Sequence, residues 1–474
     1  MDEIKFGTSG WRGIIAKDFT FANARIVIRA IGEQLIAAGR ASAGVLVGHD
    51  NRFMGEDFSR DAVGVLAAAG IRSWLCREGV PTPVIAFEIL RRRAAGGVNF
   101  TASHNPPHYN GIKFSPAWGG PALPETTHDL EARICRLQNG TPVDAMDYSQ
   151  AIAKGWVEEI DPRSFYLERL RQLVDVGVIA AAGIRVAFNP LYGVGQGYLD
   201  RVLREAGVAV SVVNNRRDPS FGGHAPEPSA EVMKDFVDLV RGDEGIALGV
   251  ATDGDADRYG IIDGDGSFIE PNYILPLLLD YLIRRRGLKN AVARSVATSH
   301  FVDAVARSHG VEVYETPVGF KYIGELIRDG KILLGGEESA GLTMAGHVPE
   351  KDGILACLLV VEMVAREGKS LKELLADLYR RVGGYFTRRI NIHLTGALQQ
   401  SFQEKLAFPP AALAGKKIDR LVTLDGSKFL FADGTWILYR LSGTEPVVRV
   451  YIEAFSPEEL ERMAGEAASF ISEG

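Results

Sequence analysis

One pattern occurs three times along the chain and restricts the folds that the sequence can adopt. Each time, a short β-branched run is followed by a stretch of helical periodicity, a glycine and a second β-like run; the glycines are Gly70, Gly207 and Gly310. A glycine suits this place because the residue just beyond a helix commonly takes a left-handed conformation. Strand–helix–strand units of this kind are typical of parallel sheets. The pattern therefore predicts three α/β domains.

The segment after about residue 380 has a different pattern of apolar and polar residues. Its runs alternate apolar and polar residues with period two: "YFTRRINIHL", "KIDRLVTLDGSKFLFADGTWILYRL" and "VVRVYIEA". Asp-Gly pairs beginning at Asp425 and Asp433 suit tight turns between antiparallel strands. A last helix is expected to begin with Ser456 as its N-cap and Pro457 in its first turn. This part of the sequence predicts a small α+β domain with an antiparallel sheet.

A length of 474 residues is about three times that of a typical domain, which leaves room for this organisation. The expected fold class is α/β, with three α/β domains that hold mixed, mostly parallel sheets and a smaller C-terminal α+β domain. The expected boundaries are 1–150, 151–260, 261–378 and 379–474.

Charge and cysteine usage exclude several classes of partner. A formal net charge of -7 provides no sequence-wide attraction to nucleic acid or to an anionic membrane, so neither is expected as a partner. Three widely spaced cysteines, Cys76, Cys135 and Cys357, favour a reducing compartment. The first residues, "MDEIKFGTSGWRG", do not resemble a signal peptide, and no apolar run approaches the ~18 residues of a membrane span. We expect a soluble, cytoplasmic protein.

The stretch "TASHNPPHYNGIKF" combines rigidity with reactive side chains. Pro106 and Pro107 remove two consecutive backbone donors, so no regular hydrogen-bond ladder can pass through it. Ser103 lies close in sequence to His104 and Lys113, which could activate it or transfer protons. The GxSxG turn of hydrolases is absent. A purely structural loop is the alternative interpretation.

The stretch "GVATDGDADRYG" places Asp253, Asp255 and Asp257 at alternate positions. Without a cation, carboxylates this close would repel one another. Oxygen ligands suit Mg²⁺ or Ca²⁺, but an EF-hand loop requires glycine where this chain has Arg258. Three carboxylates leave room for water or a substrate phosphate, which favours Mg²⁺. The alternative is a solvated acidic turn.

Two further segments could bind a phosphosugar. In "RLSGTEPVVRVYIEA", backbone and hydroxyl donors between two arginines suit a phosphate, although a hairpin turn with surface arginines would read the same way. In "GGEESAGLTMAGHVPEKDG", Glu337, Glu338 and Ser339 offer acceptors to sugar hydroxyls, and His347 and Lys351 add positive charge. A glycine-rich connection is the alternative for this second segment.

Four of these motifs in this order, "TASHNP", "DGDADR", "GEES" and "RxSGTEP", resemble the active-site motifs of the alpha-D-phosphohexomutases. This family comprises phosphoglucomutases, phosphomannomutases and phosphoglucosamine mutases. The resemblance covers essentially the whole chain and begins with "GTSGWRG". It implies four domains around a central cleft, with one loop from each domain.

The resemblance also implies a role for individual residues. Ser103 matches the phosphoserine, which would ligate the metal together with Asp253, Asp255 and Asp257. The implied catalytic residues are Ser103, His104, Lys113 and Arg12, with Lys113 and His104 as the proton-transfer candidates. The implied substrate-binding residues are Arg258, Gly319, Lys321, Glu337, Ser339, His347 and Lys351. The phosphate that is not transferred would be held by Arg440, Ser442, Gly443, Thr444 and Arg449.

The reaction implied is the interconversion of hexose 1-phosphate and hexose 6-phosphate through a phosphoserine and a bisphosphorylated sugar. One Mg²⁺ per chain is expected, with glucose 1,6-bisphosphate or an equivalent as activator, in a monomer or homodimer whose partner is a small phosphosugar. The loop "GEESAG" looks most like the phosphoglucomutase form, because Gly341 stands where the "GEMSGH" and "GEQSGH" forms have histidine. Glucose is therefore predicted. A phosphomannomutase, a dual-specificity mutase, a metal-dependent sugar phosphatase and a silent sensor are the alternatives.

Overall fold

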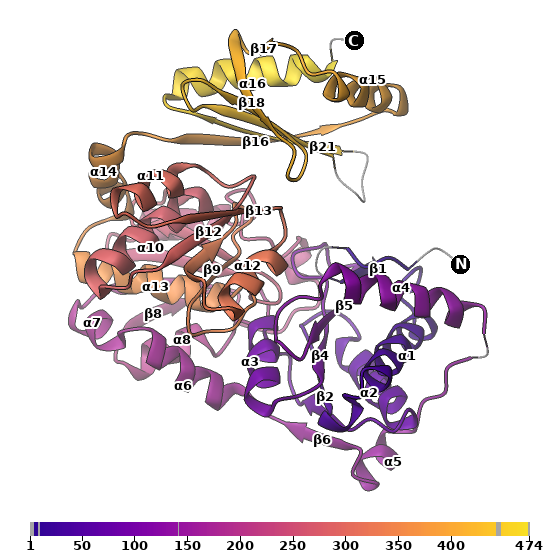
Figure 1. Ribbon diagram of the computed structural model, residues 1–474. Helices are drawn as coiled ribbons and strands as arrows, with labels where there is room; N and C mark the ends of the chain where they lie inside the picture. Colours follow the sequence, from indigo (N-terminus) through magenta and orange to yellow (C-terminus); the bar gives the residue numbers. More distant parts are fainter. Residues whose placement is uncertain (1–3, 8–9, 141, 442–446, 473–474) are drawn as a thin grey trace. The chain divides into compact units, whose positions relative to one another are not determined.

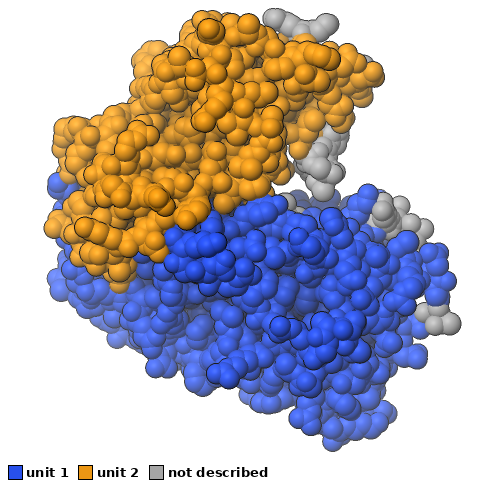
Figure 2. Space-filling view, in the orientation of Figure 1, with its two compact units in different colours: residues 1–271, 320–371 blue, residues 272–319, 372–474 orange. Residues whose placement is uncertain are grey.

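The computed structural model describes residues 4–7, 10–140, 142–441 and 447–472. The chain divides into two compact units, coloured separately in Figure 2. Unit 1 comprises residues 1–271 and 320–371, and unit 2 comprises residues 272–319 and 372–474. Many elements of both units are labelled in Figure 1.

Unit 1 begins with a six-stranded mixed sheet in the order β1-β5-β4-β2-β3-β6. The strands β2, β3, β4 and β6 are parallel, whereas β5 runs antiparallel to both β4 and β1. Their bounds are β1 Trp11–Ile14, β2 Val45–His49, β3 Ser73–Cys76, β4 Gly96–Phe100, β5 Tyr109–Pro116 and β6 Val157–Ile160. All residues of β2 and β4 are buried, as expected for central strands covered on both faces.

Helices cover this sheet because each presents an apolar stripe to it. In α1, Val27, Ile31 and Leu35 recur at helical spacing and are buried, and Thr20 caps the helix by accepting from the Asn23 amide. The helices α1, α2 and α4 share one core, while α3 packs against β2 and β4. The bounds are α1 Phe21–Ala37, η1 Ala41–Ala43, α2 Gly55–Ala68, α3 Thr82–Arg92, α4 Pro124–Gln138 and α5 Tyr148–Ala153.

A second sheet of unit 1 has the order β11-β10-β9-β7-β8. The strands β7, β8 and β9 are parallel, and β10 and β11 continue the sheet as antiparallel neighbours. The elements are α6 Arg163–Leu173, α7 Val176–Ala181, β7 Arg185–Asn189, α8 Leu199–Glu205, β8 Ala209–Val212, η2 Phe221–Gly223, α9 Lys234–Gly242, β9 Ile246–Thr252, β10 Tyr259–Asp263 and β11 Phe268–Ile269.

The last segment of unit 1 is joined to this second sheet by one almost completely buried helix. Helix α13, Gly353–Glu367, is apolar nearly all round and contacts β9, β10 and α7. A helix without a polar face belongs in an interior. Its neighbours in the segment are α12 Phe320–Arg328 and the antiparallel pair β14 Ile332–Gly336 and β15 Leu342–Met344.

Unit 2 contains a parallel strand pair and the C-terminal sheet. The parallel pair is β12 Ala291–Ser295 and β13 Val313–Thr316, accompanied by α10 Pro271–Arg286, α11 Phe301–Ser308 and α14 Leu371–Val382. The C-terminal sheet is antiparallel throughout and has the order β16-β21-β20-β19-β18-β17. Its elements are β16 Phe386–His393, α15 Gly396–Ala407, β17 Ala412–Leu413, β18 Lys416–Val422, β19 Ser427–Phe431, β20 Trp436–Leu441, β21 Val447–Ala454 and α16 Pro457–Ser472.

Local predictions for the helix ends and turns are confirmed. Gly70, Gly207 and Gly310 have φ angles of 75°, 83° and 66°, the left-handed conformation expected beyond a helix. The Asp425-Gly426 and Asp433-Gly434 pairs lie in the turns that flank β19. Helix α16 runs along the C-terminal sheet in Figure 1, and the Ser456 hydroxyl accepts from the Glu459 amide at its start. No helix in the described ranges is long and apolar enough to cross a membrane.

Candidate active site

Ser103 lies just beyond the carboxyl end of β4, in the turn that connects β4 to β5. Its φ angle of 52° is left-handed, an unusual conformation for a residue with a side chain. The residue is 1% exposed, and its hydroxyl donates to Asp253 Oδ2 at 2.7 Å. The predicted phosphoserine and one predicted metal ligand are therefore in direct contact, although 150 residues separate them in the chain.

Asp253, Asp255 and Asp257 occupy the turn between β9 and β10. Because they alternate in a tight turn, their carboxylates converge, and one oxygen from each lies within 4.8 Å of the others. All three residues are at most 1% exposed. Within the part of the chain that the structure describes, this is the one group of three or more acidic, histidine or cysteine side chains with such spacing.

Two ammonium groups approach these carboxylates. Lys113 Nζ on β5 lies 2.5 Å from Asp255 Oδ2 and 2.7 Å from Asp257 Oδ2. Lys351 Nζ, from the loop before α13, lies 3.3 Å from Asp257 Oδ2 and 2.8 Å from Glu350 Oε1. Burial alone would raise the pKa of Asp257, but the charges of Lys113 and Lys351 outweigh it and lower that pKa. Burial would lower the pKa of Lys113, and the two aspartates reverse that effect and raise it.

The carboxylates fit a divalent cation. Within the described ranges of the chain, Asp255 Oδ1 and Asp257 Oδ1 are buried and accept no hydrogen bond, which is costly unless a cation or water binds them. Burial, followed by the charges of Asp255 and Asp257, holds the pKa of Asp253 well above its usual value. A cation bound among the three groups would favour the ionised form of each. The buried triad is thus able to bind a metal ion.

Two cationic or basic side chains lie against the Ser103 turn. His104 Nδ1 is 3.4 Å from the Ser103 hydroxyl oxygen, and burial, with the charges of Arg258 and Arg12, lowers the pKa of His104 well below its usual value. Its ring is therefore neutral near pH 7. Arg12 on β1 donates from Nη1 to Asn105 Oδ1 at 2.6 Å, and burial lowers its pKa from the ordinary value.

The predicted sugar loop is connected to the aspartate turn through the backbone. Arg258 and Gly341 form an isolated β-bridge, and the Arg258 amide donates to Asp253 Oδ1 at 3.0 Å. The Glu337 amide donates to the Gly341 carbonyl at 2.9 Å, which closes the loop that carries Ser339. Glu337 is 5% exposed and Ser339 is half-buried. Lys321 lies in α12, with its ammonium over the Tyr322 ring.

The side chain of His347 contacts Asp352. Its Nε2 lies 2.6 Å from Asp352 Oδ2, which also accepts from the Tyr166 hydroxyl at 2.5 Å. The side chains of His347 and Asp352 are fully buried. Asp352 additionally caps α13 by accepting from the Leu355 amide. The structure thus places His347 in a support for the loop that carries Lys351.

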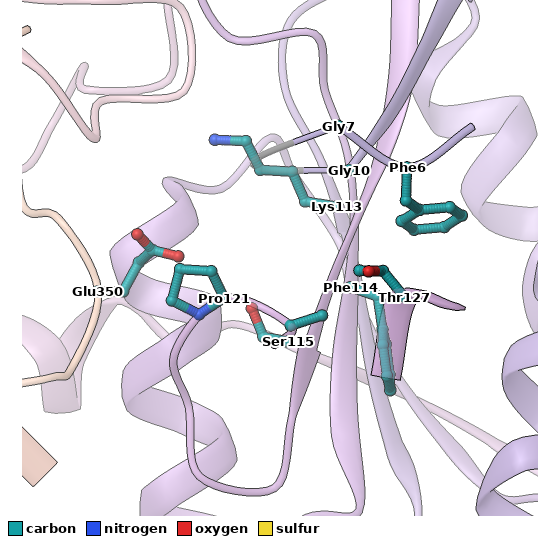
Figure 3. A pocket seen from close by; sticks show the side chains of 10 residues that line it. Phe6, Gly7, Gly10, Lys113, Phe114, Ser115, Pro121, Thr127 and Glu350 are labelled. Carbon is teal, nitrogen blue, oxygen red and sulfur yellow. The ribbon is translucent and has the colours of Figure 1, made fainter. Parts of the chain in front are cut away.

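A pocket of unit 1 opens beside Lys113 (Figure 3). The N-terminal segment contributes Phe6, Gly7 and Gly10 to it, and Lys113 and Glu350 lie on its wall. The remaining lining residues are Phe114, Ser115, Pro121, Ala122 and Thr127. The pocket therefore joins the strand that carries Lys113 to the loop that carries Lys351.

The residues predicted to hold the second phosphate belong to unit 2. Arg440 on β20 and Arg449 on β21 are directly opposite each other in the sheet register. Arg440 Nε lies 2.9 Å from Asp425 Oδ2. Gly319 is also in unit 2, with a φ angle of 129°. Ser442, Gly443 and Thr444 lie outside the described residues.

Several residues that support the site were not identified from the sequence. Thr82, at the start of α3, donates its hydroxyl to Asp255 Oδ2 and its amide to the Asp255 carbonyl. Asp50 and Arg52, just beyond β2, contact the Ser103 turn. The available signal was their place in "VGHDNR", directly after a buried strand.

Comparisons with known proteins cover all parts of the chain. Models of the phosphoglucomutase/phosphomannomutase family match in order: alpha/beta/alpha domain I at residues 3–140, domain II at 164–266, domain III at 270–382 and the C-terminal domain at 397–469. This order confirms the predicted fold class of three α/β domains and a smaller C-terminal domain.

Individual relatives match over nearly their full length. A phosphoglucomutase/phosphomannomutase of Thermococcus kodakarensis is 33% identical over 455 residues, covering 96% of this chain and 95% of the relative. A phosphoglucomutase of Komagataeibacter xylinus is 30% identical over 507 residues, covering 99% and 91%. The crystal structure of a protein described as a phosphomannomutase from Thermus thermophilus has a TM-score of 0.86, 33% identity and 99% coverage of both chains.

Proposed function

Since the chain belongs to the phosphoglucomutase/phosphomannomutase family and is thus a hexose phosphate mutase, we propose that it acts mainly on glucose phosphates and that Ser103 is its phosphoryl carrier. In this reaction a phosphoryl group passes from Ser103 to the free hydroxyl of a hexose monophosphate. The bisphosphorylated sugar then returns a phosphoryl group from its other end to Ser103, so the enzyme is regenerated and the sugar is isomerised.

The contact between Ser103 and Asp253 is the observation that carries this proposal. The hydroxyl that would bear the phosphoryl group lies 2.7 Å from one carboxylate of a buried triad. We propose that Asp253, Asp255 and Asp257 hold Mg²⁺, with Asp255 Oδ1 and Asp257 Oδ1, which accept no hydrogen bond from the described residues, among the ligands. When bound, Mg²⁺ supplies positive charge that stabilises the phosphoryl group during transfer.

Lys113 and His104 are proposed to manage the proton of the reacting hydroxyl. Burial would lower the pKa of Lys113, but the two aspartates raise it, so Lys113 holds its proton, and we propose its ammonium as the donor. His104 is neutral, because burial lowers its pKa, and can therefore accept a proton near the Ser103 oxygen. Arg12 and Arg258 would add positive charge around the transferring phosphoryl group.

The remaining predicted residues are proposed to bind the sugar and its second phosphate. Glu337 and Ser339 would accept from and donate to sugar hydroxyls, and Gly319, Lys321 and Lys351 are proposed as further substrate-binding residues. Arg440, Ser442, Gly443, Thr444 and Arg449 are proposed to hold the phosphate that is not transferred. His347, buried against Asp352, is proposed to support the Lys351 loop.

The loop that contains Gly341 supports glucose over mannose. Gly341 stands where the phosphomannomutase-like and phosphoglucosamine-mutase-like loops carry histidine. A Cβ at this position would lie 2.6 Å from Lys351 Cδ, so a larger residue would displace Lys351. Mannose is the second candidate, since the Thermus thermophilus structure of 33% identity bears the name of a phosphomannomutase.

We also propose glucose 1,6-bisphosphate or an equivalent as activator, a cytoplasmic location, and a monomer or homodimer. The bisphosphate would load Ser103 before the first turnover. Free cysteines at positions 76, 135 and 357 support a reducing compartment.

A coupled assay tests the proposal. Glucose 1-phosphate, mannose 1-phosphate and glucosamine 1-phosphate are supplied separately, with and without Mg²⁺ and the sugar bisphosphate, to wild type and Ser103→Ala. The expected result is Mg²⁺-dependent conversion with the highest kcat/KM for glucose 1-phosphate, and loss of activity in Ser103→Ala. Equal kcat/KM for two sugars would overturn the glucose preference, and full activity in Ser103→Ala would overturn the phosphoserine. Release of inorganic phosphate in place of isomerisation would indicate a phosphatase.

A further inference from the structure

The turn that carries Ser103 is held by one buried arginine. Arg52 is fully buried, and all five of its guanidinium N–H donors are used. Nη2 donates to the carbonyls of Ser103 and Asn105 at 2.7 Å each, and Nη1 donates to those of Pro106 and Tyr109 at 2.8 and 2.9 Å. The fifth donor, Nε, contacts Asp50 Oδ2 at 3.1 Å.

Asp50 connects this arginine to the Ser103 amide. Its Oδ1 accepts from the Arg52 amide at 2.9 Å, and its Oδ2 accepts from the Thr101 hydroxyl at 2.6 Å. The Thr101 hydroxyl oxygen in turn accepts from the Ser103 amide at 2.9 Å. Asp50 is completely buried and lies at the carboxyl end of β2, the strand beside β4. The Ser103 turn is thus held by its amide and by its carbonyl.

The turn needs such support because it cannot form a regular ladder. Pro106 and Pro107 lack amide donors, and the left-handed φ angle of Ser103 is unfavourable for a residue with a Cβ. Without Arg52, the carbonyl of Ser103, a residue that is 1% exposed, would lose a charged hydrogen-bond donor, and so would the three partly buried carbonyls that follow it. A planar guanidinium fits this task, because it presents its donors in a fixed arrangement, whereas a lysine ammonium has three donors and no plane.

We propose that Asp50 and Arg52 are positioning residues, which fix the Ser103 oxygen for in-line phosphoryl transfer without touching the substrate. This inference rests on the proposed role of Ser103. A displacement of about 1 Å at a reacting atom lowers a rate about 100-fold, so the expected effect is on kcat. The KM for sugar phosphate should change little, because Arg52 is enclosed by the turn and by the Phe221 ring, 5.1 Å from its guanidinium carbon.

The test compares Arg52→Lys and Asp50→Asn with Arg25→Lys. Arg25 on α1 forms a bidentate pair with Asp61 on α2, at 2.6 and 2.9 Å. Both helices pack on the same sheet as the Ser103 turn, but this pair does not contact the turn. For Arg52→Lys we expect kcat to fall about 10- to 100-fold with KM within about twofold of wild type, and a smaller fall for Asp50→Asn. Arg25→Lys should retain wild-type kcat.

Amide hydrogen exchange separates positioning from general destabilisation. In wild type, the Asn105 and Tyr109 amides donate to carbonyls inside the turn and should exchange slowly. Arg52→Lys should accelerate exchange at residues 103–109 alone. Rapid exchange of these amides in wild type, wild-type kcat in Arg52→Lys, or faster exchange across the whole N-terminal sheet in that variant would each overturn the inference. A wild type with neither mutase activity nor phosphate on Ser103 would instead refute the proposed function, and the exchange data would still report on the turn.

Discussion

Replacing Lys113 with methionine should make the stability of the protein strongly dependent on a divalent cation. Methionine keeps most of the aliphatic length of lysine and removes its charge. The charge lies 2.5 Å from Asp255 and 2.7 Å from Asp257, all of them buried. At an effective dielectric constant near 20, each of these attractions is about 6 kcal/mol before the cost of burying the ions is subtracted.

The net loss is smaller than this sum. Removing one partner of a buried ion pair costs about 3–5 kcal/mol. Asp257 keeps Lys351 at 3.3 Å, and Asp255 keeps the Thr82 hydroxyl, so we expect a loss of about 3 kcal/mol for Lys113→Met in EDTA. A cation at 100 times its dissociation constant restores about 2.7 kcal/mol.

Thermal unfolding in EDTA and in a Mg²⁺ series measures both quantities. In EDTA, the Tm of Lys113→Met is expected to lie below that of wild type. Mg²⁺ should raise the Tm of the variant by more than it raises the Tm of wild type. Lys428→Met is the matched control, because Lys428 is a buried lysine of unit 2 whose ammonium lies over the Trp436 ring, 4.0 Å from its centroid. Mg²⁺ should not restore the stability that Lys428→Met loses. A Lys113→Met protein as stable as wild type in EDTA, or equal Mg²⁺ effects in both proteins, would show that Lys113 does not neutralise these carboxylates.

Three other changes test separate parts of the structure. In Gly193→Ala, the new Cβ would lie 2.7 Å from the carbonyls of Asp253 and Gly254, so the aspartate turn or the segment that carries residue 193 must shift. We expect weaker Mg²⁺ dependence of turnover with normal circular dichroism, and a wild-type Mg²⁺ titration would contradict this. In Asp280→Asn, a carboxylate that accepts from Arg284, Arg381 and His309 is neutralised. Burial alone would raise the pKa of Asp280, but these hydrogen bonds outweigh burial and lower the pKa below its unfolded value of 3.8. Ionised Asp280 therefore stabilises the folded state above that pH, and this contribution is lost as the pH falls through the folded pKa. In urea titrations, the free energy of unfolding of Asp280→Asn should be about 2 kcal/mol below that of wild type at pH 7, and the difference should shrink below pH 4. A difference that does not depend on pH would argue against the ion pairs. Phe402→Ala opens a cavity in the fully buried C-terminal core and should cost about 3–5 kcal/mol in urea unfolding, whereas a cost below 1 kcal/mol would show that this core is loosely packed.

Features that depend only on neighbouring residues could be predicted from the sequence. The left-handed glycines beyond the helices follow from backbone sterics alone, and Gly70, Gly207 and Gly310 all obey this rule. The convergence of the three aspartates follows in the same way, because alternate positions in a tight turn after a strand bring their carboxylates together. Neither feature requires knowledge of the tertiary arrangement.

The contacts made by the residues that support the site could not be predicted from the sequence, because their partners lie far away along the chain. Arg52 binds four backbone carbonyls more than 50 positions away. Every residue has such a carbonyl, so the sequence does not show which ones accept from Arg52. Lys351 reaches Asp257 only because α13 packs on β9 and β10. His347 was predicted to bind substrate; its ring contacts Asp352, which also accepts from the Tyr166 hydroxyl, and no local pattern predicts this contact. Such partners depend on how the elements pack.

The most direct test of the central claim is to follow a labelled phosphoryl group on Ser103. The wild-type protein is incubated with Mg²⁺ and sugar bisphosphate carrying labelled phosphate, digested, and the labelled peptide is located by mass spectrometry. A second sample is chased with unlabelled glucose 1-phosphate before digestion. The label is expected on Ser103 in the first sample and on glucose phosphates in the second. A label on another residue, a label on Ser103 that glucose 1-phosphate does not remove, or release of the label as inorganic phosphate would contradict this expectation.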